Sequence, residues 1–325
     1  MKNKTFLATI IFAGFIIFSP FTVYGHTQQN ETDEASSDRK SPNVEFNDEP
    51  AARALYEKMM ETMRNAESLS YTSAYKWEAK GEELSRCTYT IWMKKPNYFR
   101  VETVGTNGSN GGTLIGDGND LWIFWPGDRP RFYPADDDES YEKTRSNVFM
   151  REATPLGKHS IGHKTGLLGG GMGSPVLDPS TFHGYTDSLQ RYIDGVTGIG
   201  IEKVGDEECD VIEVSIMKGQ RIWQLWLSRQ DHLPRKLKEV VHVSYDIVTH
   251  EQWSQVTINA EIPTKKFVWK PPEGWQQWRL PSPEERLLKP GQNAPDFELL
   301  AADGTKIKLS DHRGKVVWFY IWRAG

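Results

Sequence analysis

The chain has 325 residues, of which 38% are hydrophobic and 26% are charged, and its formal net charge is -5. This length predicts about two domains, and the apolar content is enough to build a folded core. No concentrated run of Lys and Arg accompanies the acidic balance, which argues against DNA or RNA as a partner, because phosphate backbones need a basic surface.

The first 25 residues have the features of a secretory signal. Lys2 and Lys4 precede an apolar stretch from Phe6 to Phe18, which ends at the break Ser19-Pro20. A membrane anchor is the alternative, but this stretch is shorter than the roughly 20 residues that a spanning helix needs. We therefore expect cleavage after Gly25 and an exported protein, periplasmic or secreted.

A disordered leader and one helix are expected next. Residues 26–47 are polar and acidic, which is typical of a segment without a core. From Asp48 to Leu69 the sequence predicts an amphipathic helix, with Asp48 as its cap and Pro50 in its first turn. Its apolar side chains recur on one face: Leu55, Met59, Met63 and Ala66.

Two series of short strands follow, in which apolar and polar residues alternate. The first opens with a hairpin around residues 80–84. Ten or so strands with short turns and no helices between them predict one antiparallel sheet, strongly curved or barrel-like. The expected strands are 71–77, 87–93, 98–103, 113–115, 121–125 and 131–133, then 200–204, 209–217, 221–227, 235–245, 251–260 and 267–269.

An irregular region, residues 136–196, separates the two series. Its glycines do not form a phosphate loop, because no Gly-Lys-Ser/Thr ending is present. His159, His163 and His183 could be metal ligands, but acidic and thiol partners are not spaced around them, so we expect solvent-facing histidines. The glycine-rich apolar stretch from Gly166 to Val176 is a candidate lid.

Tryptophan is the informative residue type. Ten of the 12 tryptophans lie between Trp77 and Trp278, and the alternation of the strands sends aromatic side chains to both faces of the sheet. One face must pack on helices. The other either lines a hydrophobic groove or belongs to a filled core, and the composition alone leaves both interpretations open.

Three motifs in order resemble the LolA-like family of periplasmic lipoprotein carriers and their outer-membrane lipoprotein-sorting relatives. They read "YTIWMKKPNYFRVE", "TLIGDGNDLWIFWPGD" and "KKFVWKPPEGW", and the resemblance spans about residues 48–278. It implies an α+β fold, mainly β, in which an antiparallel half-barrel covers helices. It also implies an apolar cavity that holds an acyl chain of a lipid or lipoprotein, with no cofactor, no metal and no catalytic residue.

The resemblance also points to a lid contact. In the family an arginine of the "K-R-P-N" motif holds the lid by hydrogen bonds to backbone carbonyls, and Lys95 stands at that place here. An ammonium lacks the planar fork of a guanidinium, so we expect this contact to be weaker or absent, with Arg100 as a substitute. The candidate cavity and lid residues are Lys95, Arg100, Trp77, Trp92, Trp122 and Trp223.

Cys87 and Cys209 are the two cysteines, both on expected strands. An oxidising compartment permits a disulfide between them, and the alternatives are two buried thiols or a reactive pair. The sequence does not decide among the three.

A second resemblance covers the C-terminal end. Residues 279–289 are a proline-rich linker, and residues 290–325, with "APDFEL", a "DG" turn, "LSD" and "RGK", resemble the start of a thioredoxin-like redoxin domain of the thiol-specific antioxidant kind. In that family the reactive cysteine follows the first central strand, so this chain is expected to stop before it.

Two functions of different classes follow. The first is a carrier or sensor that binds an apolar envelope ligand. The second is a thiol-disulfide oxidoreductase or peroxiredoxin-type antioxidant with a thiol or disulfide partner, whose chemistry would lie in a longer parent. A pseudoenzyme tail that only mediates contact is a further alternative.

Overall fold

The computed structural model describes residues 46–106, 108, 110–133, 136–153, 161–186, 189–301 and 303–318. The expected signal and nearly all of the expected leader lie outside these residues. The described residues divide into two compact units, and the division falls between Arg279 and Leu280.

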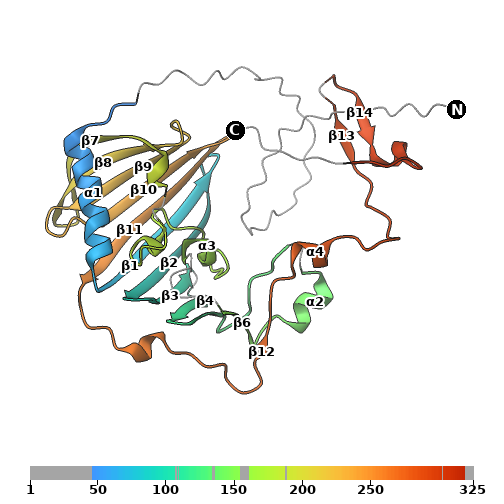
Figure 1. The fold of residues 1–325 in the computed structure, drawn as a ribbon, viewed down its shortest axis with the longest axis horizontal. Helices are drawn as coiled ribbons and strands as arrows, with labels where there is room; N and C mark the ends of the chain where they lie inside the picture. Colours follow the sequence, from blue (N-terminus) through green and yellow to red (C-terminus); the bar gives the residue numbers. More distant parts are fainter. Residues whose placement is uncertain are drawn as a thin grey trace. The chain divides into compact units, whose positions relative to one another are not determined.

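The first unit is built on one 12-stranded sheet, whose strands lie in the order β12-β6-β5-β4-β3-β2-β1-β11-β10-β9-β8-β7 (Figure 1). Every pairing is antiparallel except that of β12 with β6. The strands are β1 (Ser68–Ala79), β2 (Glu82–Lys94), β3 (Tyr98–Gly105), β4 (Asn110–Asp117), β5 (Asp120–Phe124), β6 (Val148–Ala153), β7 (Ile193–Val204), β8 (Glu207–Ile216), β9 (Arg221–Ser228), β10 (Pro234–His242), β11 (Asp246–Ile258) and β12 (Gln276–Gln277).

The pairing of β1 with β11 joins the two series of strands into one sheet. Each series is a meander of hairpins, and the turns suit their residues. Between β1 and β2, Lys80 and Gly81 both have positive φ, at 54° and 78°, as a tight hairpin turn requires. The fold is thus mainly β, as the sequence predicts, and the large curved sheet is open, because β12 and β7 form its two edges.

Helices are few and short apart from the first. In the first unit they are α1 (Pro50–Asn65), α2 (Asp138–Lys143), α3 (Ile161–Thr165) and the 3-10 turns η1 (Pro179–Thr181), η2 (Gln190–Tyr192) and η3 (Thr264–Phe267). Helix α1 lies against β7 and β8 and buries Ala52, Tyr56, Met59, Met60 and Met63.

The start of α1 differs from the sequence prediction. The cap residue is Glu49, not Asp48, and its side chain does not cap the helix. The Asp48 carboxylate instead accepts hydrogen bonds from Arg53 Nε at 2.7 Å and from the backbone N–H of Val196 at 3.0 Å. Asp48 therefore ties the helix to strand β7.

Three further differences concern strands. Residues 131–133 form no strand, and Phe267 ends the helical turn η3 instead of opening a strand. Strand β6 lies inside the region that we expected to be irregular. Its six residues form a strand through pairing with β5 and β12, and this is a tertiary effect that no short local pattern reports.

The second unit contains α4 (Pro283–Arg286), a hairpin of β13 (Glu298–Leu300) with β14 (Lys306–Lys308), and η4 (Leu309–His312). Gly304 in the hairpin turn has φ 82°, which fits the expected "DG" turn. The expected thioredoxin-like domain stays a prediction, because these elements do not define that fold.

Candidate functional site

One face of the sheet, here called the inner face, carries helix α1 and residues 161–183, here called the covering segment. Alternation along the strands sends a continuous set of large side chains to this face. This set includes Tyr71, Tyr75, Tyr89, Trp223 and Trp253, which belong to one buried cluster with side chains of the covering segment. The opposite side of the sheet is called the outer face.

The covering segment fills the space against the inner face. Leu168, Met172 and Phe182 are fully buried, and Val176 and Leu177 are nearly so. The sequence led us to expect an open hollow beneath the helices. That expectation is wrong for this part of the inner face, because the chain's own apolar side chains occupy it.

Three consecutive glycines let the covering segment turn sharply over strand β2. Gly169, Gly170 and Gly171 have φ values of 71°, 64° and 96°, a region that favours glycine. A Cβ atom on Gly171 would lie 2.6 Å from the backbone oxygen of Arg86. The candidate lid from Gly166 to Val176 therefore lies on the inner face and crosses it at close range.

Lys95 contacts the far end of the covering segment. Its Nζ donates a hydrogen bond to the backbone carbonyl of Phe182 and lies 4.6 Å from the centroid of the Phe182 ring. Burial lowers the pKa of Lys95. His183, which follows Phe182 in the covering segment, donates from Nε2 to the backbone carbonyl of Tyr98 at 3.1 Å. The contact that we expected to be weak or absent at Lys95 is thus formed.

Glu251 on β11 holds the middle of the covering segment. Its carboxylate accepts hydrogen bonds from Tyr89 Oη at 2.6 Å, Trp253 Nε1 at 3.0 Å and the backbone N–H of Val176 at 2.6 Å. The side chain is fully buried, and this burial raises the pKa of Glu251 even though the three donors oppose the shift.

Further contacts fix the glycine-rich part. Ser85 Oγ donates to the carbonyl of Gly171 at 3.0 Å, and Trp125 Nε1 donates to that of Leu167 at 3.1 Å. The backbone N–H of Gly112 donates to Leu168 at 2.7 Å. None of these bonds is part of a strand ladder, so the covering segment is attached by isolated polar contacts around an apolar centre.

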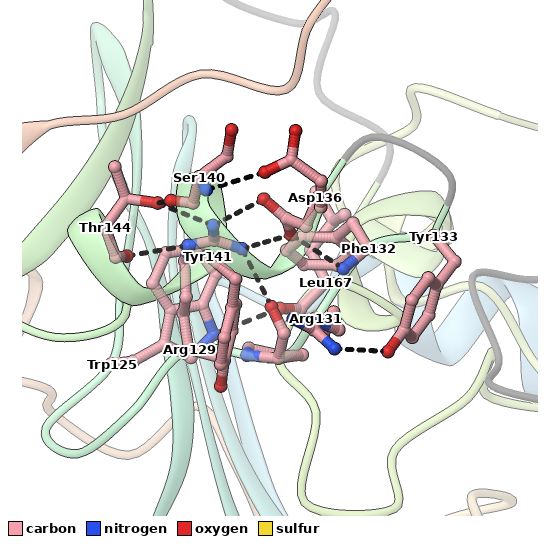
Figure 2. Close-up of polar contacts among 12 residues, drawn as sticks. Trp125, Arg129, Arg131, Phe132, Tyr133, Asp136, Ser140, Tyr141, Thr144 and Leu167 are labelled. Atoms are coloured by element: carbon pink, nitrogen blue, oxygen red, sulfur yellow. Dashed lines mark hydrogen bonds and ion pairs between the residues drawn. The ribbon is translucent and has the colours of Figure 1, made fainter.

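A buried ion pair supports the side of the site that Trp125 occupies (Figure 2). Arg129 donates to both carboxylate oxygens of Asp136 at 2.6 Å, to the backbone and side chain of Thr144, and to the carbonyl of Pro130. All five of its N–H groups are thereby used. Its guanidinium carbon lies 4.1 Å from the centroid of the Trp278 ring.

This ion pair positions a group of aromatic rings. Trp278 stacks on Phe132 with centroids 5.4 Å apart and meets Trp125 edge-on at 6.3 Å. Since Trp125 bonds the covering segment at Leu167, the Arg129 network holds one wall of the site in place.

The predicted site residues divide between the two faces. Lys95, Trp77 and Trp223 belong to the inner side, where Trp223 Nε1 donates to Glu239 at 2.7 Å. Arg100, Trp92 and Trp122 lie on the outer face, so the structure does not bring them together with Lys95 at the covering segment. Each follows or precedes an inward residue, and the two-residue period sends it outward. Arg100 donates to the carbonyl of Lys266 and does not substitute for Lys95.

Both cysteines are free and buried, and they lie in different clusters. Cys87 Sγ is 3.8 Å from Met172 Sδ on the inner face, whereas Cys209 packs with Val211 and Trp226. Burial raises the pKa of Cys87 to about 12 and that of Cys209 to about 11. Of the three alternatives, the disulfide is not formed, and protonated buried thiols do not make a reactive pair.

Two of the three histidines that the sequence raised as possible metal ligands lie within the described residues. His183 is half-buried at the end of the covering segment, so it is not the solvent-facing residue that we expected, whereas His163 is exposed. His159 lies outside the described residues. No group of three or more potential ligands occurs among the residues that the structure describes.

Glu251 and Arg129 were not among the site residues predicted from the sequence. Glu251 alternates with Thr249 and Trp253 on one strand face, and a carboxylate in that apolar series was a readable signal. Arg129 gave no such signal, because its partner Asp136 stands in a run of exposed-looking acidic residues. Within the described part of the chain, no helix has the length and apolarity needed to cross a bilayer.

Comparison with known proteins concerns mainly the fold and the compartment. Residues 172–279 match a family model described as "Predicted periplasmic protein (DUF2092)". This match confirms the predicted localisation: the protein is exported and periplasmic. A search of curated proteins gave no match.

Among solved structures, the chain is similar to a LolA superfamily protein of Nitrosomonas europaea (13% identity, 67% of this chain and 97% of that chain, TM-score 0.30). It is similar to the lipoprotein LppX of Mycobacterium tuberculosis (12%, 66% and 99%, TM-score 0.36). It also matches the MucA/MucB complex of Pseudomonas aeruginosa (15%, 79% and 74%, TM-score 0.35). These likenesses concern the fold, and their low scores carry no argument about activity.

Proposed function

We propose that the first unit binds an acyl chain of a lipid or lipoprotein between the inner face and the covering segment. The observation that supports this most is the way the segment is attached. Its apolar side chains lie where a ligand chain would lie, while its backbone is held by separate side-chain bonds from Lys95, Glu251, Ser85 and Trp125. Such bonds can open one by one without breaking the sheet.

The apolar burial that stabilises the closed form, in which the covering segment packs on the inner face, is comparable in free energy with the burial of a bound acyl chain. Burying Leu168, Met172 and Phe182 stabilises the closed form by about 1.5–3 kcal/mol for each side chain. An acyl chain gains about 0.8 kcal/mol per buried methylene, so a dozen methylenes give about 10 kcal/mol before ordering costs. A long chain can therefore displace the apolar side chains of the covering segment from the inner face and bind beneath the segment, and a short one cannot.

Native mass spectrometry of the exported protein, with extraction and identification of copurified lipid, tests this proposal. We expect a copurified or added long-chain fatty acid at one molecule per chain, and affinity that rises steeply with chain length. A protein that copurifies with no lipid and binds neither a fluorescent fatty acid nor a long-chain fatty acid would contradict it.

A second proposal concerns the unit that begins at Leu280: we infer that it is the start of a thioredoxin-like domain of a longer thiol oxidoreductase. The supporting observation is local. The motif residues fold together, since Asp296 Oδ1 accepts from the backbone N–H of Ser310 at 2.8 Å and Leu309 donates to the carbonyl of Phe297. Sequencing the gene past the codon for Gly325 tests it: a cysteine within about fifteen codons is expected, and an immediate stop would contradict it.

A further inference from the structure

A separate pocket lies on the outer face of the sheet, away from the covering segment. Its volume is about 630 Å³. The floor is formed by Trp92 of β2 with the hydroxyl groups of Ser70 and Thr257, which lie 2.6 Å apart. Residues 260–266 form one wall. The inner-face ligand proposed above plays no part in this pocket.

The pocket is held open by contacts to backbone carbonyls of its wall. Ser68 Oγ donates to Ala260, Lys94 Nζ donates to Ile262 at 2.9 Å, and Arg100 Nη1 donates to Lys266 at 3.1 Å. Phe267, directly after the wall, is fully buried and anchors it. The wall is therefore a built feature and not a loose loop.

Positive charge is in excess at this pocket. Arg100, Lys265 and Lys266 line it, and two carboxylates, those of Glu102 and Glu261, oppose them. Glu102 accepts from Arg100 Nε, and its Oε1 lies 3.8 Å from Lys266 Nζ. No described residue pairs with Lys265 Nζ or with Arg100 Nη2, so both keep donors for a ligand.

Three kinds of donor line the pocket. A guanidinium edge, an ammonium group and a pair of hydroxyl groups surround a space next to an indole ring, above which Lys266 Nζ lies at 3.4 Å from the centroid. The oxygens of a phosphate group are arranged tetrahedrally and can accept from donors that do not share one plane, whereas the two oxygens of a carboxylate lie in one plane. We propose that the outer pocket binds a phosphate group, carried by a soluble phosphate ester or by a phospholipid head.

Calorimetric titration of the full exported chain with inorganic phosphate and with glycerol 1-phosphate tests this site. We expect one saturable site whose affinity falls with added salt. Arg100→Gln should weaken binding about tenfold, and Lys265→Gln should weaken it by a smaller factor. Arg100→Gln also removes a bond to the wall and could change the local structure. Lys265 is exposed, so Lys265→Gln should keep the fold and tests the site independently. Lys203→Gln, an exposed lysine of β7, is the matched control and should bind as the parent does.

Vesicles distinguish the two sources of the phosphate group. Binding to phosphatidylglycerol vesicles that glycerol 1-phosphate displaces and that Lys265→Gln weakens assigns the pocket to a lipid head. Binding of the soluble esters without vesicle binding assigns it to a soluble phosphate. Absence of saturable binding, or binding that is equal in the parent, Arg100→Gln and Lys265→Gln, would overturn the proposal.

Discussion

The inner and outer faces of the same sheet are covered in different ways. On the inner face, the covering segment contributes apolar side chains but is held by single hydrogen bonds to its backbone. On the outer face, Trp269 and Trp275 pack into an aromatic cluster with Trp122, Phe124 and Phe149, and Trp269 stacks on Phe124 at 4.2 Å.

The chain continues from this outer cluster around the edge of the sheet. Gln276 and Gln277 pair with β6, and Trp278 then packs on the other side, beside Arg129. The outer cover is thus attached to the sheet by the strand pairing of β12 with β6 and by the packing of Trp278 on Arg129 of the buried ion pair. This difference suggests that the outer cover is permanent, whereas the inner cover is removable, and the predictions below test that contrast.

The largest effect is expected from Asp136→Ala. It leaves the fully buried guanidinium of Arg129 without its carboxylate, which should lower the free energy of unfolding by about 3–5 kcal/mol, as measured by urea denaturation. The control is Asp138→Ala, because the Asp138 side chain is 94% exposed and pairs with Arg131 at the surface. This control should change stability by less than about 1 kcal/mol. Equal effects would show that the buried pair does not support the wall.

Trp269→Ala tests the permanence of the outer cover. Removing a stacked indole should destabilise the fold by about 3 kcal/mol while the affinity for a fatty acid stays unchanged. Val268→Ala is the neighbouring control, since Val268 is exposed. Thermal unfolding and fatty-acid titration of both variants measure the two effects. Weakened ligand binding in Trp269→Ala alone would contradict the division between the faces.

Lys95→Met tests the removable inner cover. It keeps the aliphatic length but loses the bond to Phe182, so the closed form should weaken by about 1 kcal/mol, and amide hydrogen exchange in residues 161–183 should speed up by about fivefold. Lys94→Met is a close control, because Lys94 donates to a backbone carbonyl on the outer side, that of Ile262. Exchange in the covering segment should not change in this control, and a change of equal size would refute the role of Lys95.

The smallest effect is expected from pH at Glu251. Burial raises the pKa of Glu251 in the folded protein, so its contribution to stability is complete below the unfolded pKa and is lost as the pH rises through the folded value. The difference in melting temperature between the parent and Glu251→Gln should therefore shift in favour of the parent on going from pH 8 to pH 5. A difference that is constant with pH would show that Glu251 does not titrate in the closed form.

The sequence predicts the strands well where both partners are long and alternating. The hairpin of β1 and β2 is one example, and the burial of Tyr71 and Tyr89 follows directly from the two-residue period. Prediction from the sequence fails where a segment takes its conformation from its neighbours in the fold. Strand β6 forms through β5 and β12, and Phe267 belongs to a turn because its ring is buried beside β3.

The site follows the same rule. A glycine run marks residues 166–176 and a family motif marks Lys95, and the structure brings both to the inner face. Trp92 and Trp122 do not lie with Lys95 on the inner face, because a count of tryptophans says nothing of faces, which the two-residue alternation along each strand decides. The buried charge of Arg129 depends on Asp136, which stands in an acidic run, so no local pattern predicts it. Glu251 alternates with Thr249 and Trp253 on one buried strand face, and that local signal was overlooked.

A reversible lock on the covering segment tests the central claim most directly. Cys87 Sγ lies next to Met172 Sδ, so Met172→Cys in a Cys209→Ser background places two thiols together on the inner face. Mass spectrometry verifies the disulfide, and Met172→Ser in the same background is the control that cannot form it. We predict that the oxidised form takes up no long-chain fatty acid and that reduction restores uptake to the level of the control. Equal uptake by the oxidised and reduced forms would contradict the account.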